Sequence, residues 1–125
     1  MSSSGETIKT GVIGKVKWFN NKAGYGFVTV TDGIQSGTDI FVNLAFKTRD
    51  YIKKLGEAEY TQENLRIIEN SIKRARDSNP KSIILISSGV VTKYLQNGGK
   101  DYDDAYTRLK IYEEECFKRL SIELN

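Results

Sequence analysis

Three short stretches decide the fold of the N-terminal half: Gly14-Lys-Val-Lys-Trp-Phe-Asn20, Gly24-Tyr-Gly-Phe-Val28 and Asp39-Ile-Phe-Val-Asn43. Aromatic and β-branched residues, which favour strands, are frequent in all three. The connections between them, residues 20–24 and 32–37, are rich in Asn, Asp and Gly, which is typical of turns. Three strands with connections this short predict an antiparallel meander.

The same stretches place five aromatic rings within 24 positions, namely Trp18, Phe19, Tyr25, Phe27 and Phe41. Residues two apart on a strand share a face, so Tyr25 and Phe27 are expected together, as are Lys15 and Lys17. Val28 and Val30 occupy the opposite face, which favours binding over burial for the rings. Rings stack bases, and lysines neutralise phosphates. Because stacking needs unpaired bases, the expected partner is single-stranded RNA or DNA.

Glycines flank Tyr25 on both sides, at Gly24 and Gly26. A residue without a side chain leaves a gap beside the ring. We expect a flat base to approach the backbone through these gaps.

The motifs resemble the cold-shock domain family over residues 11–43. Lys-Trp-Phe-Asn followed by Gly-Tyr-Gly-Phe-Val is similar to the family's first ribonucleoprotein motif, and Ile-Phe-Val-Asn is similar to its second. The resemblance implies a five-stranded Greek-key β-barrel of the OB type. It also implies a non-catalytic protein that binds single-stranded RNA or DNA and acts as an RNA chaperone. The expected nucleic-acid-binding residues are Lys15, Lys17, Trp18, Phe19, Asn20, Lys22, Tyr25, Phe27, Phe41 and Asn43.

Two positions depart from the family pattern. Asn43 stands where the second motif usually ends in histidine, and asparagine stacks poorly on a base. Ala23 stands where a lysine usually precedes the first glycine, with Lys22 one place earlier. We expect a weaker or altered subsite at each of these positions.

The second half of the chain has a different, largely helical pattern. Apolar residues at spacings of three and four predict a helix over Thr61 to Asp77, and Asn79-Pro80 ends it. The apolar stripe of this helix is formed by Leu65, Ile68, Ile72 and Ala75. Ser82 to Ser87 is predicted to be a buried strand, and Gly89 to Leu95 a strand or a helix. A last helix is predicted from Asp101 or Asp103 to about Ile122. Its apolar stripe is formed by Ala105, Leu109, Tyr112, Cys116 and Leu120.

The predicted fold class is therefore α+β, with an OB- or cold-shock-like sheet or barrel followed by helices. Three arrangements remain open. The barrel closes late around an inserted helix, the strands pair with Ile83 to Ile86 in another way, or a foreign segment begins near residue 44, as in a chimera. The expected division is a disordered N-terminus at 1–10, a β-domain at 11–95 with a helical insertion at about 61–77, and a C-terminal helix at 96–125.

Composition narrows the function classes further. The chain has no histidine and a single cysteine, so no metal, cofactor or histidine-based catalysis is expected. No apolar run is long enough to span a membrane, and a cytoplasmic location is expected. Residues 1–55 hold eight lysines and arginines against four acids, which favours an anionic partner for that half.

Two further interpretations concern the helices. The bases of the first helix, Arg66, Lys73, Arg74 and Arg76, are interpreted as a solvated face rather than as an extension of the nucleic-acid track. The C-terminal helix could bind a second copy of the chain or a protein partner. The alternative function is accordingly a protein-interaction or oligomerisation module in which the aromatic strands form the core.

Overall fold

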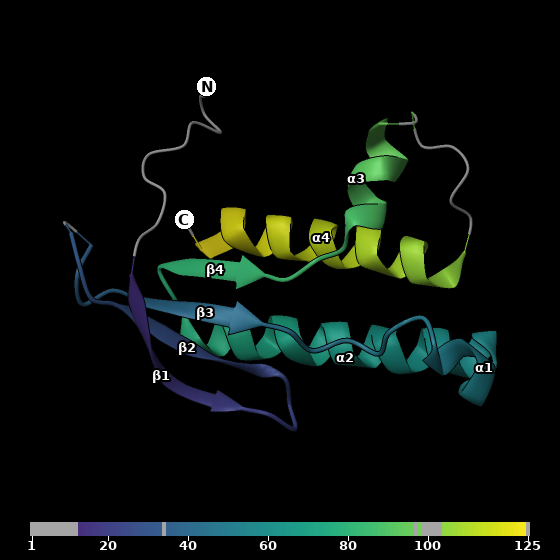
Figure 1. The fold of residues 1–125 in the computed structure, drawn as a ribbon, viewed down its shortest axis with the longest axis horizontal. Helices are drawn as coiled ribbons and strands as arrows, with labels where there is room; N and C mark the ends of the chain where they lie inside the picture. The colour runs from purple at the N-terminus through teal and green to yellow at the C-terminus, as the bar shows by residue number, and fades with distance from the viewer. Residues whose placement is uncertain (1–12, 34, 97, 99–103, 125) are drawn as a thin grey trace.

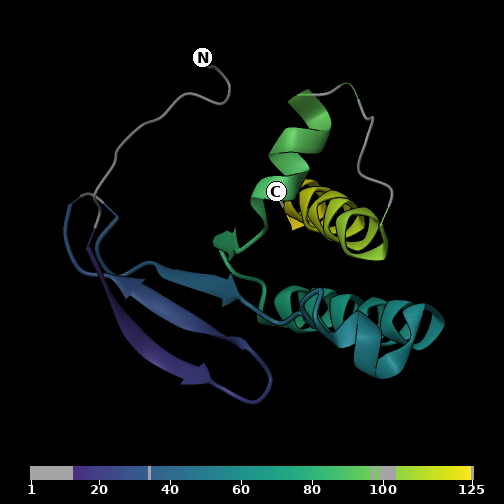
Figure 2. The same ribbon diagram turned by 45° about the vertical axis from the view of Figure 1, so that its right-hand side comes forward.

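The fold is α+β, as the sequence predicts (Figure 1). It is described by a computed structural model that covers residues 13–33, 35–96, 98 and 104–124. Four strands form one open sheet in the order β1-β2-β3-β4. The long helices α2 and α4 lie on the same side of this sheet (Figure 2). The predicted disordered N-terminus, and Asp101 and Asp103 as the start of the last helix, lie outside the described residues.

The first three strands form the expected antiparallel meander. They are β1 (Gly14–Asn20), β2 (Tyr25–Val30) and β3 (Asp39–Asn43). The turn between β1 and β2 is closed by the Asn20 side chain, whose Oδ1 accepts a hydrogen bond from the Ala23 amide at 2.9 Å. Gly24 completes the turn at a φ of 77°, a conformation that glycine adopts without strain.

The fourth strand is added by a helical crossover. After β3 come α1 (Tyr51–Leu55), α2 (Glu57–Ser78) and β4 (Ser82–Leu85), and β4 pairs in parallel with β3. A parallel pair requires such a crossover, because a tight turn can join only antiparallel strands. Of the three arrangements left open by the sequence, the structure shows the one in which the strands pair with the segment Ile83 to Ile86 in another way than in a closed barrel. The sheet formed by the described residues ends at β1 on one side and at β4 on the other.

The run Ser82 to Ser87 was expected to be a buried strand, and this is wrong. It forms an edge strand in which Ser82 and Ile84 are exposed while Ile83 and Leu85 are partly buried. A continuous apolar run does not reveal that one of the two faces stays uncovered.

Helix α2 starts earlier than expected and buries a face with polar members. Its buried residues follow the helical spacing and are Tyr60, Asn64, Ile68, Ser71 and Ala75. Leu65, expected on the apolar stripe, is 40% exposed. The helix ends at Asn79, which takes the left-handed conformation at a φ of 46° before Pro80.

The C-terminal helices are α3 (Gly89–Gln96) and α4 (Ala105–Leu124). Asp104 caps α4, because its Oδ1 accepts a hydrogen bond from the Thr107 amide at 2.9 Å. The buried stripe of α4 is rotated relative to the expected one. Phe117 is buried, whereas Tyr112 is exposed and Cys116 is only partly buried.

Two apolar clusters hold the layers together. The first joins Phe41 of β3 to Ala75 of α2 and to Phe117 and Leu120 of α4. The second joins the two long helices and α1, and its buried members are Tyr60, Ala105 and Leu109. The sheet is therefore packed on both helices at once.

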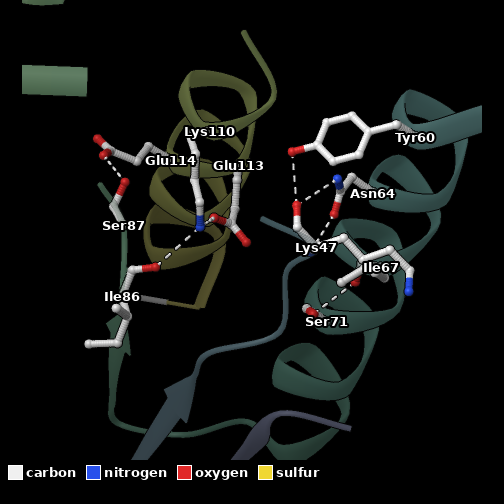
Figure 3. Close-up of polar contacts among 10 residues, drawn as sticks. All are labelled: Lys47, Tyr60, Asn64, Ile67, Ser71, Ile86, Ser87, Lys110, Glu113 and Glu114. Atoms are coloured by element: carbon white, nitrogen blue, oxygen red, sulfur yellow. Dashed lines mark hydrogen bonds and ion pairs between the residues drawn. The ribbon is translucent and has the colours of Figure 1, made fainter. Parts of the chain in front are cut away.

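A buried ion pair lies between the two clusters (Figure 3). The Nζ of Lys110 is 3.1 Å from Oε1 of Glu113 and 3.8 Å from the ring centroid of Phe46, and both charged side chains are almost fully buried. Burial raises the pKa of Glu113, and the opposing Lys110 charge limits that rise.

The outer face of the sheet carries exposed apolar side chains on its two edge strands, although Val30 of β2 is buried. Val16 is 62% exposed and Ile84 is 45% exposed, and both face away from the helices. Apolar residues on this face correspond to the side that a closed barrel would bury.

We predict that Phe41→Ala lowers the free energy of unfolding by about 3–5 kcal/mol, because it empties the centre of the first cluster. Urea denaturation followed by circular dichroism measures the change. The control is Ile122→Ala, since Ile122 is 72% exposed and should change stability little. Equal losses in the two variants would contradict the core position of Phe41.

We also predict that Lys110→Met destabilises the protein at neutral pH by about 3–5 kcal/mol, since it leaves the buried Glu113 carboxylate without its counter-charge. The loss should shrink as the pH falls, because a protonated Glu113 no longer needs that charge. The double variant Lys110→Met/Glu113→Leu should recover most of the stability. Urea titrations at several pH values test this, and a loss independent of pH would contradict it.

Candidate nucleic-acid interface

Four of the five predicted rings lie on one face of the sheet, the face that carries the helices. The pairing register brings Trp18, Phe27 and Phe41 into one row across β1, β2 and β3. The ring centroids are 5.4 Å apart for Trp18 and Phe27 and 5.5 Å apart for Phe27 and Phe41. Tyr25 lies beside this row, 5.4 Å from Trp18 and 5.8 Å from Phe41.

The exposure of the rings increases along the row from Phe41 to Trp18. Phe41 is fully buried, Tyr25 and Phe27 are partly buried, and Trp18 is 43% exposed. The gradient follows from the helices, which cover β3 and leave the β1 edge open. Trp18 is therefore the ring most available to a ligand.

A β-bulge brings Lys17 to the same face as Trp18. Val16 pairs with Val28 and Trp18 with Phe27, so Lys17 is the extra residue in β1. Strict alternation along β1 would put Lys17 and Trp18 on opposite faces of the sheet, whereas the bulge puts them on the same face.

The cation of Lys17 is paired within the site. Its Nζ lies 2.7 Å from Oδ2 of Asp39, and Thr29 donates a hydrogen bond to Oδ1 of the same carboxylate. The hydrogen bond from Lys17, followed by that from Thr29, holds the pKa of Asp39 below its usual value. Asp39 therefore stays charged and holds Lys17 beside the rings.

An open cleft of about 710 Å³ lies beside Trp18. Strands β1 and β2, the loop before β3 and the turn between α2 and β4 all contribute to its walls. We call it the Trp18 cleft, and its walls include Lys17, Trp18, Phe27, Thr38, Asn79 and Lys81. It combines one exposed ring, one partly buried ring, two ammonium groups, the carboxylate of Asp39 and polar side chains.

Phe41 and Asn43 are buried, whereas both were expected to contact the nucleic acid. Both side chains are 0% exposed, so neither reaches a ligand in this conformation. Phe41 packs in the first cluster, and the Asn43 amide is buried with no hydrogen-bond partner in the structure. The sequence pattern did not reveal that α2 and α4 would cover this end of the ring face.

Phe19 and the glycine next to Tyr25 also differ from expectation. Phe19 pairs with Gly26 on the opposite face from Trp18, and a side chain at Gly26 would meet the Phe19 ring at 2.7 Å. The gap at Gly26 is thus filled by Phe19 rather than left for a base. Gly24 likewise packs closely against Ala45.

The remaining predicted residues lie around the β1–β2 hairpin. Lys15 is exposed near the start of β1, and Asn20 uses its amide oxygen to close the turn. Lys22 is exposed in that turn and lines a second, separate hollow. The structure thus brings Lys17, Trp18 and Phe27 together and leaves Lys15 and Lys22 at the periphery.

Two basic residues near the rings lie outside the predicted site: Lys81 was not a candidate, and Arg74 was interpreted as part of a solvated helix face. Lys81 lines the Trp18 cleft, and the guanidinium carbon of Arg74 lies 4.7 Å from the Tyr25 ring centroid. The helix stop at Asn79-Pro80 did indicate a turn near Lys81. Nothing in the sequence indicated that the turn returns to Trp18.

Other kinds of site find little support in the structure. Among the described residues, no group of His, Cys, Asp and Glu is placed to hold a metal ion. In the same part of the chain, every helix is too short or too polar to cross a membrane.

Residues 12–61 match the family model of the 'Cold-shock' DNA-binding domain. This confirms the resemblance seen in the sequence and extends it past residue 43 into the start of α2. Three similar relatives are the cold shock-like protein CspE of Bacillus anthracis, the cold shock protein CspB of Geobacillus stearothermophilus and the cold shock protein CspD of Bacillus subtilis.

Each relative is 44% identical to this chain over 46 residues. The aligned segment is 37% of this chain and 63–64% of the relatives, so the chain spans less than two thirds of their length. No solved structure matches the chain significantly. The family likeness thus covers the strands that carry the rings and leaves most of α2 and all that follows without a match.

We predict that Gly26→Ala destabilises the protein by about 1–3 kcal/mol, because its new methyl group would lie 2.3 Å from the Trp18 carbonyl oxygen and 2.7 Å from the Phe19 ring. The shift of β1 should also move the emission maximum of Trp18, the single tryptophan. Gly89→Ala is the matched control, since nothing lies within 4 Å of the added atom. An unchanged emission spectrum and stability in Gly26→Ala would contradict the close approach of β1 and β2.

Proposed function

We propose that this protein binds single-stranded nucleic acid, RNA or DNA, without catalysis, by stacking bases in the Trp18 cleft. The observation that carries the proposal is the exposed Trp18 ring beside Phe27, with Lys17 and Lys81 on the walls of the same cleft. The match of residues 12–61 to a DNA-binding domain family supports it.

In the proposed binding mode, the aromatic rings contact the bases and the lysines contact the phosphates. A base stacks on Trp18, with Phe27 behind it, and each stacked base contributes about 1–3 kcal/mol. Lys81 and Lys17 neutralise phosphates, although Lys17 must share its charge with Asp39. Phe41 and Asn43 support this row from the core and do not contact the ligand.

Stacking of this kind favours unpaired over paired bases. A protein that binds only unpaired bases shifts weak RNA hairpins toward the open state, which is the chaperone activity we propose. A ring stacks on the face of any base, so the proposed binding tolerates many sequences.

The experiment is a titration of the whole chain with oligo-dT and oligo-U, followed by the fluorescence of Trp18. We expect quenching that weakens steeply as the salt concentration rises. Absence of quenching at low salt with both oligonucleotides would overturn the proposal.

We predict that Trp18→Ala weakens oligonucleotide binding by about 1–3 kcal/mol, because the exposed stacking ring is lost. Anisotropy of a labelled oligonucleotide measures the affinity without the tryptophan signal. The matched control is Tyr112→Ala, an aromatic residue of α4 that is 44% exposed, much as Trp18 is. Equal affinities in the two variants would contradict a role for the Trp18 ring in binding.

A second candidate function is a protein-interaction or oligomerisation module. The observation that favours it is the burial of Phe41 together with the uncovered apolar residues Val16 and Ile84 on the outer face. The same titration separates the two functions, because an interaction module would bind no oligonucleotide. Variants of the outer face would then change the oligomeric state instead.

A further inference from the structure

A second hollow lies at the other end of the ring face, with a volume of about 400 Å³. Three segments distant in sequence contribute to it: the β1–β2 turn, the stretch after β3, and the middle of α2. We call it the Arg74 pocket, and its walls include Lys22, Gly24, Phe46, Lys47, Asn70 and Arg74.

The charged residues that line this pocket are Lys22, Lys47 and Arg74, and no acidic residue lines it. Within the described part of the chain, Lys22 and Arg74 have no ion pair, while Lys47 Nζ lies 3.7 Å from Glu63. The groove between α2 and α4 differs, because Glu69 and Glu123 accompany its bases. The Arg74 pocket therefore has the charge that an anionic ligand requires.

The wall of the pocket at Lys47 is fixed by the hydrogen bonds drawn in Figure 3. The backbone of Lys47 makes three hydrogen bonds to buried side chains of α2. Its amide donates to Oδ1 of Asn64 at 2.8 Å, and its carbonyl accepts from the Tyr60 hydroxyl at 2.9 Å and from Nδ2 of Asn64 at 3.1 Å. On the opposite wall, the Gly24 carbonyl accepts a hydrogen bond from the Leu44 amide at 2.7 Å. A site already in place loses little entropy when a ligand enters.

The position of Arg74 connects the pocket to the rings. Its guanidinium carbon lies 4.7 Å from the centroid of Tyr25, whose ring is in turn 5.4 Å from Trp18. A guanidinium over an aromatic ring can still direct its N–H groups toward phosphate oxygens. A nucleic-acid strand with one base stacked on Trp18 would therefore have its next phosphates near Arg74.

We propose that the Arg74 pocket binds a phosphate group of the same nucleic-acid strand whose bases stack in the Trp18 cleft. This inference rests on the proposed function. It makes α2, most of which lies beyond the segment matched by the family model, part of the interface. The phosphate is an internal phosphodiester or a terminal phosphate, and the two share the same chemistry of recognition.

The test compares Arg74→Gln and Lys22→Gln in the whole chain with the matched controls Arg66→Gln and Lys93→Gln. Arg66 is exposed on α2 and Lys93 on α3, and neither contributes to the pocket walls. Affinity for oligo-dT is measured by anisotropy at several salt concentrations. The slope of log affinity against log salt is negative, and each pocket variant should reduce its magnitude by about 0.7, as expected for one lost phosphate contact to a single strand. Lys22 lies in an exposed turn, so Lys22→Gln remains informative if Arg74→Gln fails to fold.

The outcomes separate this inference from the proposed function. If the wild type binds in a Trp18-dependent manner and both pocket variants match their controls, the pocket inference is overturned and the proposed function stands. If the wild type binds no oligonucleotide, both are overturned. If binding depends on Arg74 and Lys22 but not on Trp18, the pocket stands without the stacking. A dependence seen only with 5′-phosphorylated oligo-dT assigns the pocket to a terminal phosphate, and a dependence seen with both forms assigns it to an internal one.

Discussion

The contact of Phe41 with Ala75, Phe117 and Leu120 is the interaction on which the remaining structure depends. It lies where β3, α2 and α4 meet, so one side chain fixes the sheet against both long helices. The same ring begins the row that ends at the exposed Trp18. The burial of Phe41 thus fixes one end of the row of rings, and Trp18 at the other end stays exposed. The fold and the proposed binding surface share one set of side chains in this protein.

The sequence predicted the parts of the fold that depend on local pattern. The meander, the α2 helix with its stop at Asn79-Pro80 and the α+β class all follow from periodicity and turn chemistry over short windows. What it did not predict depends on distant contacts. The edge position of β4 and the rotation of the α4 stripe toward Phe117 depend on how distant elements pack, and the bulge at Lys17 interrupts the alternation within the β1–β2 pair.

The candidate site also has parts that follow from local pattern and parts that depend on distant contacts. Trp18 and Phe27 lie together because pairing between adjacent strands places them there, and the bulge in β1 brings Lys17 to the same face. Phe41, Asn43 and Phe19 do not face the cleft, because helices that follow in the chain cover β3 and because Phe19 fills the space over Gly26. Lys81 and Arg74 join the rings only through the crossover. A motif therefore identifies the chemistry of a surface, whereas the helices decide how much of it remains open.

The parallel pairing of β3 with β4 also sets the order in which the chain can fold. Ile40 pairs with Ser82, so this contact must wait until the intervening segment has been synthesised and its ends have met. Phe117 and Leu120 are made later still. A nascent chain therefore forms its hairpins early, and Phe41 lacks its contacts with Phe117 and Leu120 until α4 has emerged. Such non-local closure slows folding and leaves apolar surface open to aggregation in the interval.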